Sequence, residues 1–272
     1  MTSKTNPLSQ PEPWNLVAQG YANKIHWVME PFARLAIELV DLDSHSLVLD
    51  LACGPGTLSL QLAPKVKHVT AVDFSKAMLG QLSHLKKSLV LDNITLVHGD
   101  GQDLDLTNHS FDAAFSMFGL MFFPDRLKGF SQIRRVLKPG AKAVISSWAP
   151  IERSPMMRLL FGSLQAIEPS IEKPEAILDS LENPEVFSSE MKQAGFSKVE
   201  IKEHTLTLPK IKAEDFWKNL VESAVPLVML RRKMGETIWQ ERSKKAIDYL
   251  HEQFEGRTQA LSTTAFLGVG YA

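Results

Sequence analysis

Two glycines, Gly54 and Gly56, stand between a short apolar run and a segment with helical character. Glycine at such a turn lets the backbone approach a bound molecule with no Cβ atom in between. Open α/β sheets bind ligands at the carboxyl ends of their strands, and a helix N-terminus beside the loop offers free N–H groups to a carboxylate. Residues 48–58 therefore predict a loop that binds a small ligand.

A dinucleotide-binding fold has a similar loop and carries an acidic residue about 20 positions further on. Asp73 stands at about that distance from Gly54. Two features disfavour this interpretation. Ser59 occupies the position of the third glycine of the dinucleotide loop, and Asp50 lies in the strand before the loop, where such folds usually carry an apolar residue or glycine.

The apolar patterning around the loop predicts alternating strands and helices. Helices are expected within residues 14–40 and at 186–194. Two more are expected to begin at Leu58 and after Ser75, which would be an N-cap, and another is expected to end at Pro139 and Gly140. Strands are expected at 47–52, 68–73, 94–98, 111–116, 141–148, 198–208 and 261–272. This alternation is typical of βαβ units. It predicts an α/β fold with a doubly wound, mostly parallel, Rossmann-like sheet of seven strands.

The remaining segments are expected to cover the sheet. Residues 1–13 carry three prolines and are predicted to form a loose N-terminal tail. Residues 14–272 are predicted to form a single domain. Its helical cover is expected from residues 14–45, 150–185 and 213–256, because insertions in α/β folds gather at the loop end of the sheet.

The composition excludes several classes of function. The chain has 272 residues, a formal net charge of −1 and one cysteine. A near-neutral chain has no broad attraction for nucleic acid or for an anionic membrane surface. A lone cysteine excludes an intramolecular disulfide and a multi-cysteine metal site, and it fits a reducing compartment. With no secretory signal or membrane-spanning run, we expect a cytoplasmic protein without metal, and the oligomeric state is not predicted.

Five segments in order resemble the motifs of class I S-adenosylmethionine-dependent methyltransferases. They are DLACGPGT at 50–57, AVDFS at 71–75 with Met78, GDGQDL at 99–104, FDAAFS at 111–116 and LKPGA at 137–141. The resemblance covers residues 14–148 well and the end of the chain loosely. Within the family, the chain is most similar to the small-molecule branch (methyltransferase type 11) that includes the ubiquinone and menaquinone methyltransferases.

The resemblance implies S-adenosylmethionine as the cofactor and assigns roles around its methionine and ribose. Gly54 and Gly56 would pass close to the methionine part, with Ala52 beside them. Asp50 would help to hold the ammonium group, directly or through water. Asp73 would accept hydrogen bonds from both ribose hydroxyls, as a carboxylate can.

The remaining implied roles concern the adenine and the reactive sulfur. Phe74 and Met78 would pack on the adenine faces. Asp100 would accept a hydrogen bond from the adenine amino group, beside the backbone of Gly101 or Gln102. At the end of the fourth strand, Ser116 and Met117 would border the sulfonium, and Tyr21 would close over the carboxylate end of the cofactor.

Several of these residues also have a purely structural interpretation. Asp73 could cap the helix that follows it, and Asp100 could be a turn aspartate. Met78 could be a core residue of an apolar helix face, and Tyr21 could serve only in packing.

Methyl transfer from a sulfonium is an in-line displacement, which requires alignment and exclusion of water. A general base is needed only if the acceptor carries a proton that must leave. His26, close in sequence to Tyr21, is the one candidate base, and the catalytic residues are otherwise not predicted.

The stretch 117–123 is apolar and aromatic, and it favours an apolar or aromatic small acceptor. Phe118, Met121 and Phe122 are the predicted pocket residues, although they could simply fill the core beneath the cover. Motifs for methylating exocyclic amines of nucleic-acid bases or cytosine C5 are absent. The basic residues of 231–245 alternate with acids as on a solvated helix face, so no nucleic-acid partner is expected.

The sequence thus favours an enzyme that methylates a small molecule. Two alternatives stay open: a catalytically silent protein that binds the cofactor as a sensor or scaffold and, less favoured, a NAD-dependent oxidoreductase.

Overall fold

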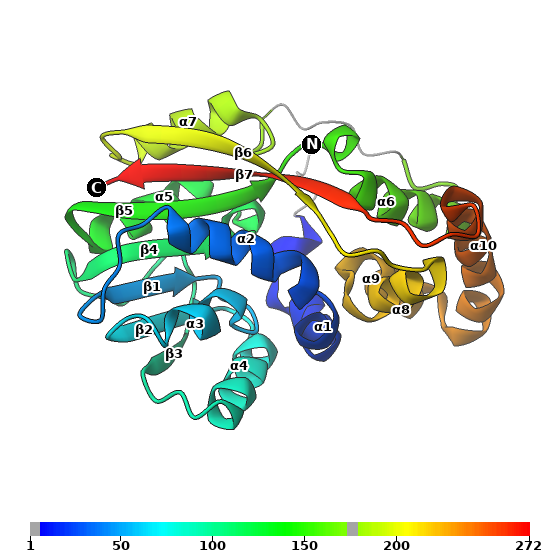
Figure 1. Ribbon diagram of the computed structural model, residues 1–272, viewed down its shortest axis with the longest axis horizontal. Helices are drawn as coiled ribbons and strands as arrows, with labels where there is room; N and C mark the ends of the chain where they lie inside the picture. The colour runs from blue at the N-terminus through cyan, green and yellow to red at the C-terminus, as the bar shows by residue number, and fades with distance from the viewer. Residues whose placement is uncertain (1–5, 173–178) are drawn as a thin grey trace.

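A computed structural model describes residues 6–172 and 179–272 of the chain. Its centre is a seven-stranded sheet in the order β3-β2-β1-β4-β5-β7-β6 (Figure 1). Strands β1 to β5 pair in parallel, and β7 runs antiparallel to both β5 and β6. The predicted doubly wound, mostly parallel, Rossmann-like sheet is therefore confirmed. The strands are β1 (Leu47–Leu51), β2 (His68–Asp73), β3 (Ile94–His98), β4 (Phe111–Met117), β5 (Leu137–Trp148), β6 (Val199–Thr207) and β7 (Ser262–Tyr271).

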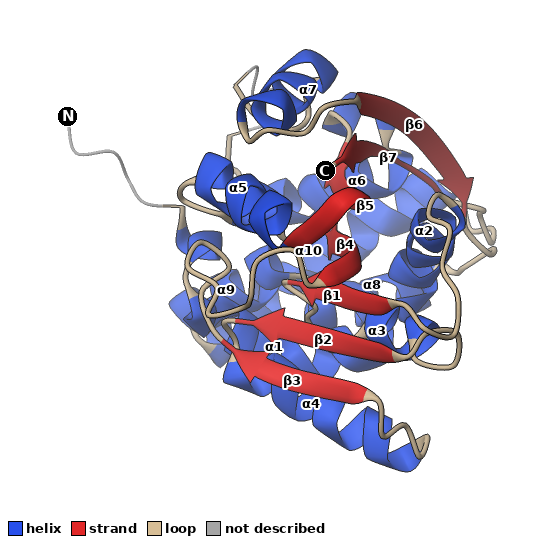
Figure 2. Cartoon of the chain, turned by 90° about the vertical axis from the view of Figure 1, so that its left-hand side faces the viewer, coloured by secondary structure: helices blue, strands red, loops and turns tan. Residues whose placement is uncertain are grey.

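The central strands are apolar on both sides because helices cover both faces of the sheet. Successive side chains of β1 point to opposite faces: Val48 joins one apolar cluster and Leu49 the other. The helices α2 (His26–Glu38), α3 (Thr57–Leu62) and α4 (Lys76–Ser88) pack on the first cluster. The helices α5 (Arg126–Val136) and α7 (Pro184–Gln193) pack on the second, on the other side of the sheet (Figure 2).

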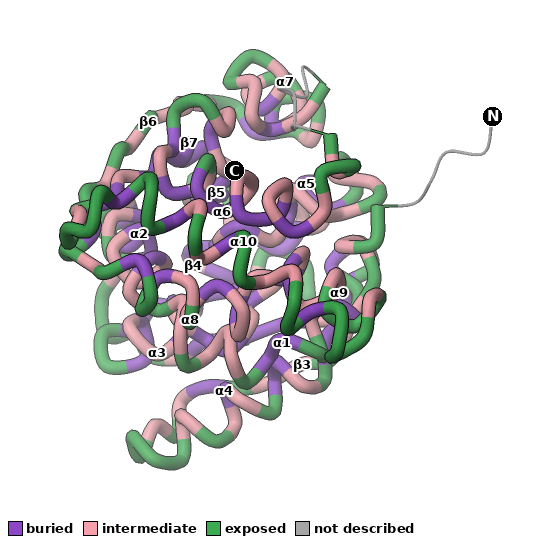
Figure 3. The backbone as a smooth tube through the Cα atoms, turned by 90° about the vertical axis from the view of Figure 1, so that its right-hand side faces the viewer, coloured by how far each residue is buried: buried purple, intermediate pink, exposed green. Residues whose placement is uncertain are grey.

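A second group of helices forms an apolar cluster of its own beyond the sheet. It comprises α6 (Pro155–Ile167), α8 (Ala213–Ser223), α9 (Val225–Met234) and α10 (Glu236–Phe254), which lie together in Figure 1. The helix α1 (Pro11–Lys24) contacts α4, α8 and α9. The outward turns of α4 and α10 are exposed, whereas the strands inside are buried (Figure 3). The cover predicted at 213–256 is thus helical, and that predicted at 150–185 contains α6, with residues 173–178 outside the described ranges.

The N-terminal segment differs from its prediction as a loose tail. Residues 1–5 lie outside the described ranges, but Pro7–Ser9 form a short 3-10 helix (η1) and α1 already begins at Pro11. Proline suits the first turn of a helix, where its missing N–H would have no partner. The Trp14 Nε1–H donates to the Leu8 carbonyl at 2.8 Å and ties this segment to α1.

The predicted helix end at Pro139 and Gly140 is also wrong, because α5 ends at Val136 and β5 begins at Leu137. A residue before proline is pushed into extended conformation, so Lys138 favours the strand. Two further 3-10 turns, η2 (Leu120–Phe122) and η3 (Ile151–Arg153), follow β4 and β5. None of the helices within the described ranges is both long and apolar enough to cross a membrane. The same residues contain no cluster of three or more His, Cys, Asp or Glu suited to a metal ion.

Candidate active site

A cavity of about 490 Å³ lies at the carboxyl ends of the central strands, and we call it the first cavity. The strand order reverses between β1 and β4, and such a reversal opens a crevice at that edge of an open sheet. Most residues that the sequence assigned to a cofactor lie in its wall: Tyr21, Asp50, Ala52, Gly54, Asp73, Phe74, Met78, Asp100, Gly101, Gln102 and Met117.

The loop after β1 turns through three left-handed residues, Ala52, Gly54 and Gly56, with φ of 56°, 55° and 89°. The Gly54 N–H donates to Asp73 Oδ2 at 2.8 Å, which ties the loop to the end of β2. A Cβ atom added at Gly54 would meet no atom within 4 Å. Because Gly54 also lines the first cavity, its bare backbone leaves room for a ligand to lie against it.

Gly56, unlike Gly54, does not lie in the wall of the first cavity. A Cβ atom at Gly56 would lie 2.2 Å from Leu82 Cδ1 of α4. Glycine is therefore needed there for the left-handed turn that begins α3 and for close packing against α4.

Asp50 is a buried carboxylic acid at the end of β1, with 1% of its surface exposed. Its Oδ2 accepts a hydrogen bond from the Ser59 hydroxyl at 2.6 Å. Burial raises the pKa of Asp50 to about 7, and the nearby charge of Asp73 adds to this while the Ser59 hydrogen bond opposes it. Both the protonated and the ionised form of Asp50 are therefore populated near neutral pH.

Asp73 ends β2 and is 5% exposed. Its two carboxylate oxygens accept from the backbone N–H groups of Gly54 and Ser75, each at 2.8 Å. Burial raises the pKa of Asp73, and these N–H groups oppose that shift. The cap of α4 is Ser75, whose hydroxyl accepts from the Met78 N–H. Since a carboxylate can accept about four hydrogen bonds, Asp73 keeps capacity for a ligand.

The two acids share one electrostatic property. Neither forms an ion pair with a lysine or arginine within the ranges that the structure describes. Buried carboxylates without a countercharge are costly, and a cation entering the first cavity would relieve that cost. The same burial and the two acids raise the pKa of Cys53, so its thiol stays protonated.

The loop after β3 adopts the turn that a structural aspartate would make. The exposed Asp100 accepts from the Gln102 N–H at 2.9 Å and from its side-chain amide at 3.0 Å. Gln102 Oε1 in turn accepts from the N–H of Asp125, whose carboxylate caps α5. The turn interpretation of Asp100 therefore holds, and the residue still lines the first cavity.

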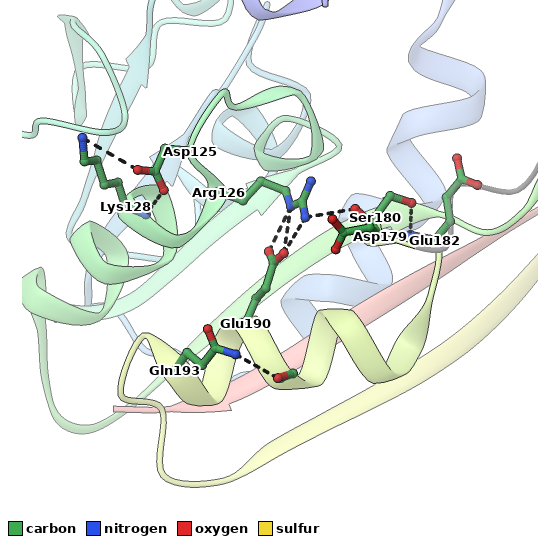
Figure 4. A network of polar contacts seen from close by, with 9 residues as sticks. Asp125, Arg126, Lys128, Asp179, Ser180, Glu182, Glu190 and Gln193 are labelled. Carbon is green, nitrogen blue, oxygen red and sulfur yellow. Dashed lines mark hydrogen bonds and ion pairs between the residues drawn. The ribbon is translucent and has the colours of Figure 1, made fainter. Parts of the chain in front are cut away.

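Beside Asp125, a polar network joins α5 to α7. Arg126 binds both carboxylate oxygens of Glu190 and donates to the Asp179 carbonyl at 3.2 Å (Figure 4). Asp125 also pairs with Lys128 on the next turn of α5, as the same view shows. Because Asp125 is the N-cap of α5, these contacts fix the start of the helix that the Gln102 loop contacts.

Tyr21 and Met78 bring helices α1 and α4 to the wall of the first cavity. Met78 also packs in the small apolar cluster between α1, α4 and α9, so it is both a core residue and part of the cavity wall. Burial and the charge of Asp73 raise the pKa of Tyr21, which therefore keeps its phenolic proton near neutral pH.

Two further predicted site residues, Ser116 and His26, do not lie in the wall of the first cavity. Ser116 is fully buried and lies outside the wall, whereas Met117 lies in it, because neighbouring side chains of β4 point to opposite faces. His26, the candidate base, is exposed at the first position of α2 and lies outside the wall of the first cavity.

A second cavity of about 330 Å³ adjoins the first. The two share the wall residues Leu8, Trp14, Tyr21, Met29, Phe118 and Phe122. The predicted pocket residues Phe118, Met121 and Phe122 all line this second cavity. Phe118 holds a left-handed backbone (φ 56°), its N–H donates to the buried Ser146 hydroxyl at 2.9 Å, and its ring stacks on Trp148 with centroids 4.0 Å apart.

Sequence reasoning missed the contribution of the helical cover to this second cavity. Trp27 and Met29 of α2, and residues of α6 and α8 such as Met156 and Phe216, complete its wall. Their apolar helical spacing indicated only that these segments pack, since periodicity does not say against what. Residues 8–11, predicted as part of a tail, line the first cavity.

The chain is similar to known proteins in its central part. A family model described as a methyltransferase domain matches residues 48–140. A demethylmenaquinone methyltransferase of Clavibacter sepedonicus is 35% identical over 167 residues, 56% of this chain and 66% of that protein. The protein of the same name from Oceanobacillus iheyensis is 35% identical over 108 residues, 39% of this chain and 45% of that protein. The chain thus spans about half to two thirds of the length of these curated relatives.

Solved structures share the fold at low sequence identity. A Haloferax volcanii putative methyltransferase, in complex with the Trm112 methyltransferase activator, matches with a TM-score of 0.61 and 17% identity over 97% of this chain and 98% of that one. A Haemonchus contortus phosphoethanolamine N-methyltransferase 2, in complex with S-adenosyl-L-methionine, matches with a TM-score of 0.54 and 20% identity over 88% of this chain and 52% of that one.

The sheet order and the cavity at its switch point define a Rossmann-like α/β protein with a ligand site at the loop end. Together with the match at residues 48–140, they identify a methyltransferase domain with a Rossmann-like fold in this chain.

Proposed function

We propose that this protein transfers the methyl group of S-adenosylmethionine to a small apolar or aromatic acceptor. The observation that carries the proposal is the pair of buried acids, Asp50 and Asp73, beside the bare backbone of Gly54. Both acids face a cavity and neither has a cationic partner within the described ranges. S-adenosylmethionine carries an ammonium and a sulfonium group, so its charge complements this site.

The residues of the first cavity fit the cofactor in a consistent order. Asp50 would receive the ammonium, and Asp73 would accept from the ribose hydroxyls. The turn at Asp100 and Gly101 would lie beside the adenine, with Phe74 and Met78 as apolar neighbours. When bound, the cofactor supplies an activated methyl group on a positively charged sulfur.

The acceptor would occupy the second cavity, where the protein would position it and exclude water. Met117 ends β4 in the wall of the first cavity, and Phe118, the next residue, lines both cavities, so Phe118 would border the space between donor and acceptor. The Phe118 ring is held between Phe32 and Trp148, with centroids 5.4 and 4.0 Å away. A fixed apolar wall aligns the reactants and excludes water. With His26 exposed on the surface, we propose no side-chain base.

The site argues against the two alternative functions. NAD carries a negatively charged diphosphate, which the buried Asp50 beside the loop would repel. A silent sensor needs only the first cavity, so the adjoining second cavity favours an enzyme. The single buried cysteine and the near-neutral charge support a small-molecule acceptor and the cytoplasm as the place of action.

Calorimetry with S-adenosylhomocysteine and with NAD tests the cofactor assignment. We expect binding of S-adenosylhomocysteine and none of NAD, and NAD binding alone would overturn the proposal. Incubation with methyl-labelled S-adenosylmethionine and a panel of phenols, quinones and amines tests turnover. Incorporation of label identifies an enzyme, and binding without any incorporation favours the sensor.

A further inference from the structure

Helix α1 borders both cavities but is held by a small part of the apolar core. Trp14 and Tyr21 of this helix line the first and the second cavity. Only three of its residues, Pro13, Val17 and Ala18, are buried. An element with few buried apolar contacts opens locally more readily than the core of a protein does. Polar contacts can therefore contribute much of what keeps α1 in place.

One polar side chain of α1 reaches the segment that follows β2. Asn15 Oδ1 accepts hydrogen bonds from the Ser75 hydroxyl at 2.7 Å and from the Ala77 N–H at 3.3 Å. Ser75 is the N-cap of α4, and its own N–H donates to Asp73 Oδ1 at 2.8 Å. Asn15 thus connects the helix that borders both cavities to the acid proposed to bind the cofactor ribose.

The contact serves α1 more than it serves α4. The Ser75 hydroxyl accepts from the Met78 N–H at 3.1 Å, so α4 keeps its N-cap without Asn15. Within the described ranges, no other side-chain hydrogen bond joins α1 to α4. On its other side α1 packs against α8, where a Cβ atom added at Gly20 would lie 1.9 Å from the Glu222 carbonyl oxygen. Helix α1 therefore lies between α4 and α8 (Figure 1), and Asn15 is its polar contact on the α4 side.

We infer that Asn15 is a positioning residue that latches α1 over the cofactor site, so that the cofactor enters and leaves the first cavity when this latch opens. The inference rests on the proposed function, because it takes the first cavity as the cofactor site. Asn15 itself lines neither cavity. It acts through the position of Trp14 and Tyr21 and not by touching a ligand.

Hydrogen exchange measured by mass spectrometry tests the latch without any ligand. In Asn15→Ala the peptide that covers α1 should exchange about three- to tenfold faster, as expected for the loss of one hydrogen bond. Peptides from β1 and from the later turns of α4 should exchange as in the unsubstituted protein. Asn15→Asp keeps an acceptor oxygen at the same position and should return the exchange of α1 to within about twofold of the original rate.

Rapid-mixing kinetics with S-adenosylhomocysteine test what the latch does to the site. Trp14 lines the first cavity, so tryptophan fluorescence serves as the signal. A latch controls passage in both directions, whereas a lost ligand contact changes mainly dissociation. Asn15→Ala should therefore raise the association and dissociation rate constants together, each about three- to tenfold. Their ratio, the dissociation constant, should stay within about twofold of the original.

Asn23→Ala is the matched control for both measurements. Asn23 is an exposed asparagine on the same helix and lines neither cavity. Its side chain makes no hydrogen bond with the part of the chain that the structure describes. Its replacement should leave the exchange of α1 and both rate constants unchanged.

Three results would overturn the inference: unchanged exchange of α1 in Asn15→Ala, unchanged rate constants, or a rise in dissociation alone, which would indicate a direct contact with the ligand. The unsubstituted protein tests the proposed function separately. If it binds S-adenosylhomocysteine while Asn15→Ala gives any of these three results, the proposed function stands and this inference fails. If the unsubstituted protein does not bind S-adenosylhomocysteine, both fail.

Discussion

The two cavities share a wall but are built in different ways. The first lies at the ends of sheet strands, and its charged groups are fixed by backbone hydrogen bonds such as Gly54 N–H to Asp73. The second is enclosed by helices of the cover, and its wall is largely apolar side chains from α1, α2, α6 and α8. The first can therefore recognise charge with a rigid frame, whereas the second recognises shape and leaves its occupant open to variation.

Replacing the acid at the end of β2 should have the largest effect on the first cavity. We expect Asp73→Ala to weaken S-adenosylhomocysteine binding by about 1.5–3 kcal/mol, roughly 10- to 150-fold, because it removes hydrogen bonds to a charged group. Calorimetry measures this. Asp112→Ala is the control: that carboxylate binds the Leu47 N–H and Lys138 at the other end of the sheet, so stability should fall and affinity should not. Unchanged affinity in Asp73→Ala would contradict its proposed role.

A methyl group added to the loop should have the next largest effect. Gly54→Ala should weaken S-adenosylhomocysteine binding about tenfold, because the new Cβ projects into space that the ligand needs. Gly140→Ala is matched to it, since Gly140 also has a positive φ (79°) and open space around its missing Cβ but lies outside both cavities. Both variants should lose similar stability, about 1–2 kcal/mol, in thermal unfolding. Equal affinities in the two variants would show that Gly54 does not border the ligand.

The pH dependence of binding tests the proposed contact of Asp50 with the ammonium group and should show a smaller effect. Burial raises the pKa of Asp50 in the free protein to about 7. A bound ammonium would lower it, so below pH 7 binding must drive off a proton. The affinity for S-adenosylhomocysteine should therefore fall by up to about tenfold from pH 8 to pH 6, and this dependence should be absent in Asp50→Asn.

Without ligand, the same group acts on stability in the opposite direction. Between its ordinary value of 3.8 and about 7, native Asp50 keeps a proton that the unfolded chain has lost. The free energy of unfolding should thus fall as the pH rises through this range, more steeply than in Asp50→Asn. Identical pH profiles for the two proteins in both experiments would remove Asp50 from the account.

The smallest expected effect concerns His26. Because His26 is exposed and lines neither cavity, His26→Ala should leave the rate of methyl transfer within about twofold of the original. A tenfold or greater loss of the methyl-transfer rate, with S-adenosylhomocysteine binding intact, would restore His26 as a candidate base. It would also mean that the acceptor lies within reach of His26.

The first cavity could be predicted from sequence because its parts are local. Strand, glycine turn and helix follow one another within residues 47–62, and Asp73 and Asp100 each end or follow a strand of the same sheet. Parallel strands bring such positions to one edge without any knowledge of packing. The motif does not specify that Gly56 packs closely against α4 or that the Ser116 side chain points away from the first cavity.

The second cavity could be predicted only in part, because it depends on contacts between distant segments. Phe118, Met121 and Phe122 were found because they directly follow β4. The strands β1 to β6 all lie between Trp27 and Phe216 in the sequence, yet both residues line the second cavity. An apolar helix face has the same sequence pattern whether it packs against another helix or lines a ligand cavity. Neither periodicity nor composition could therefore distinguish a packing residue from a cavity residue.

The shared wall of Tyr21, Phe118 and Phe122 has a thermodynamic consequence. Any shift in these side chains when one chamber fills also reshapes the other. If the methyl donor and the acceptor bind as proposed, each would then change the other's dissociation constant by one common factor, whichever binds first.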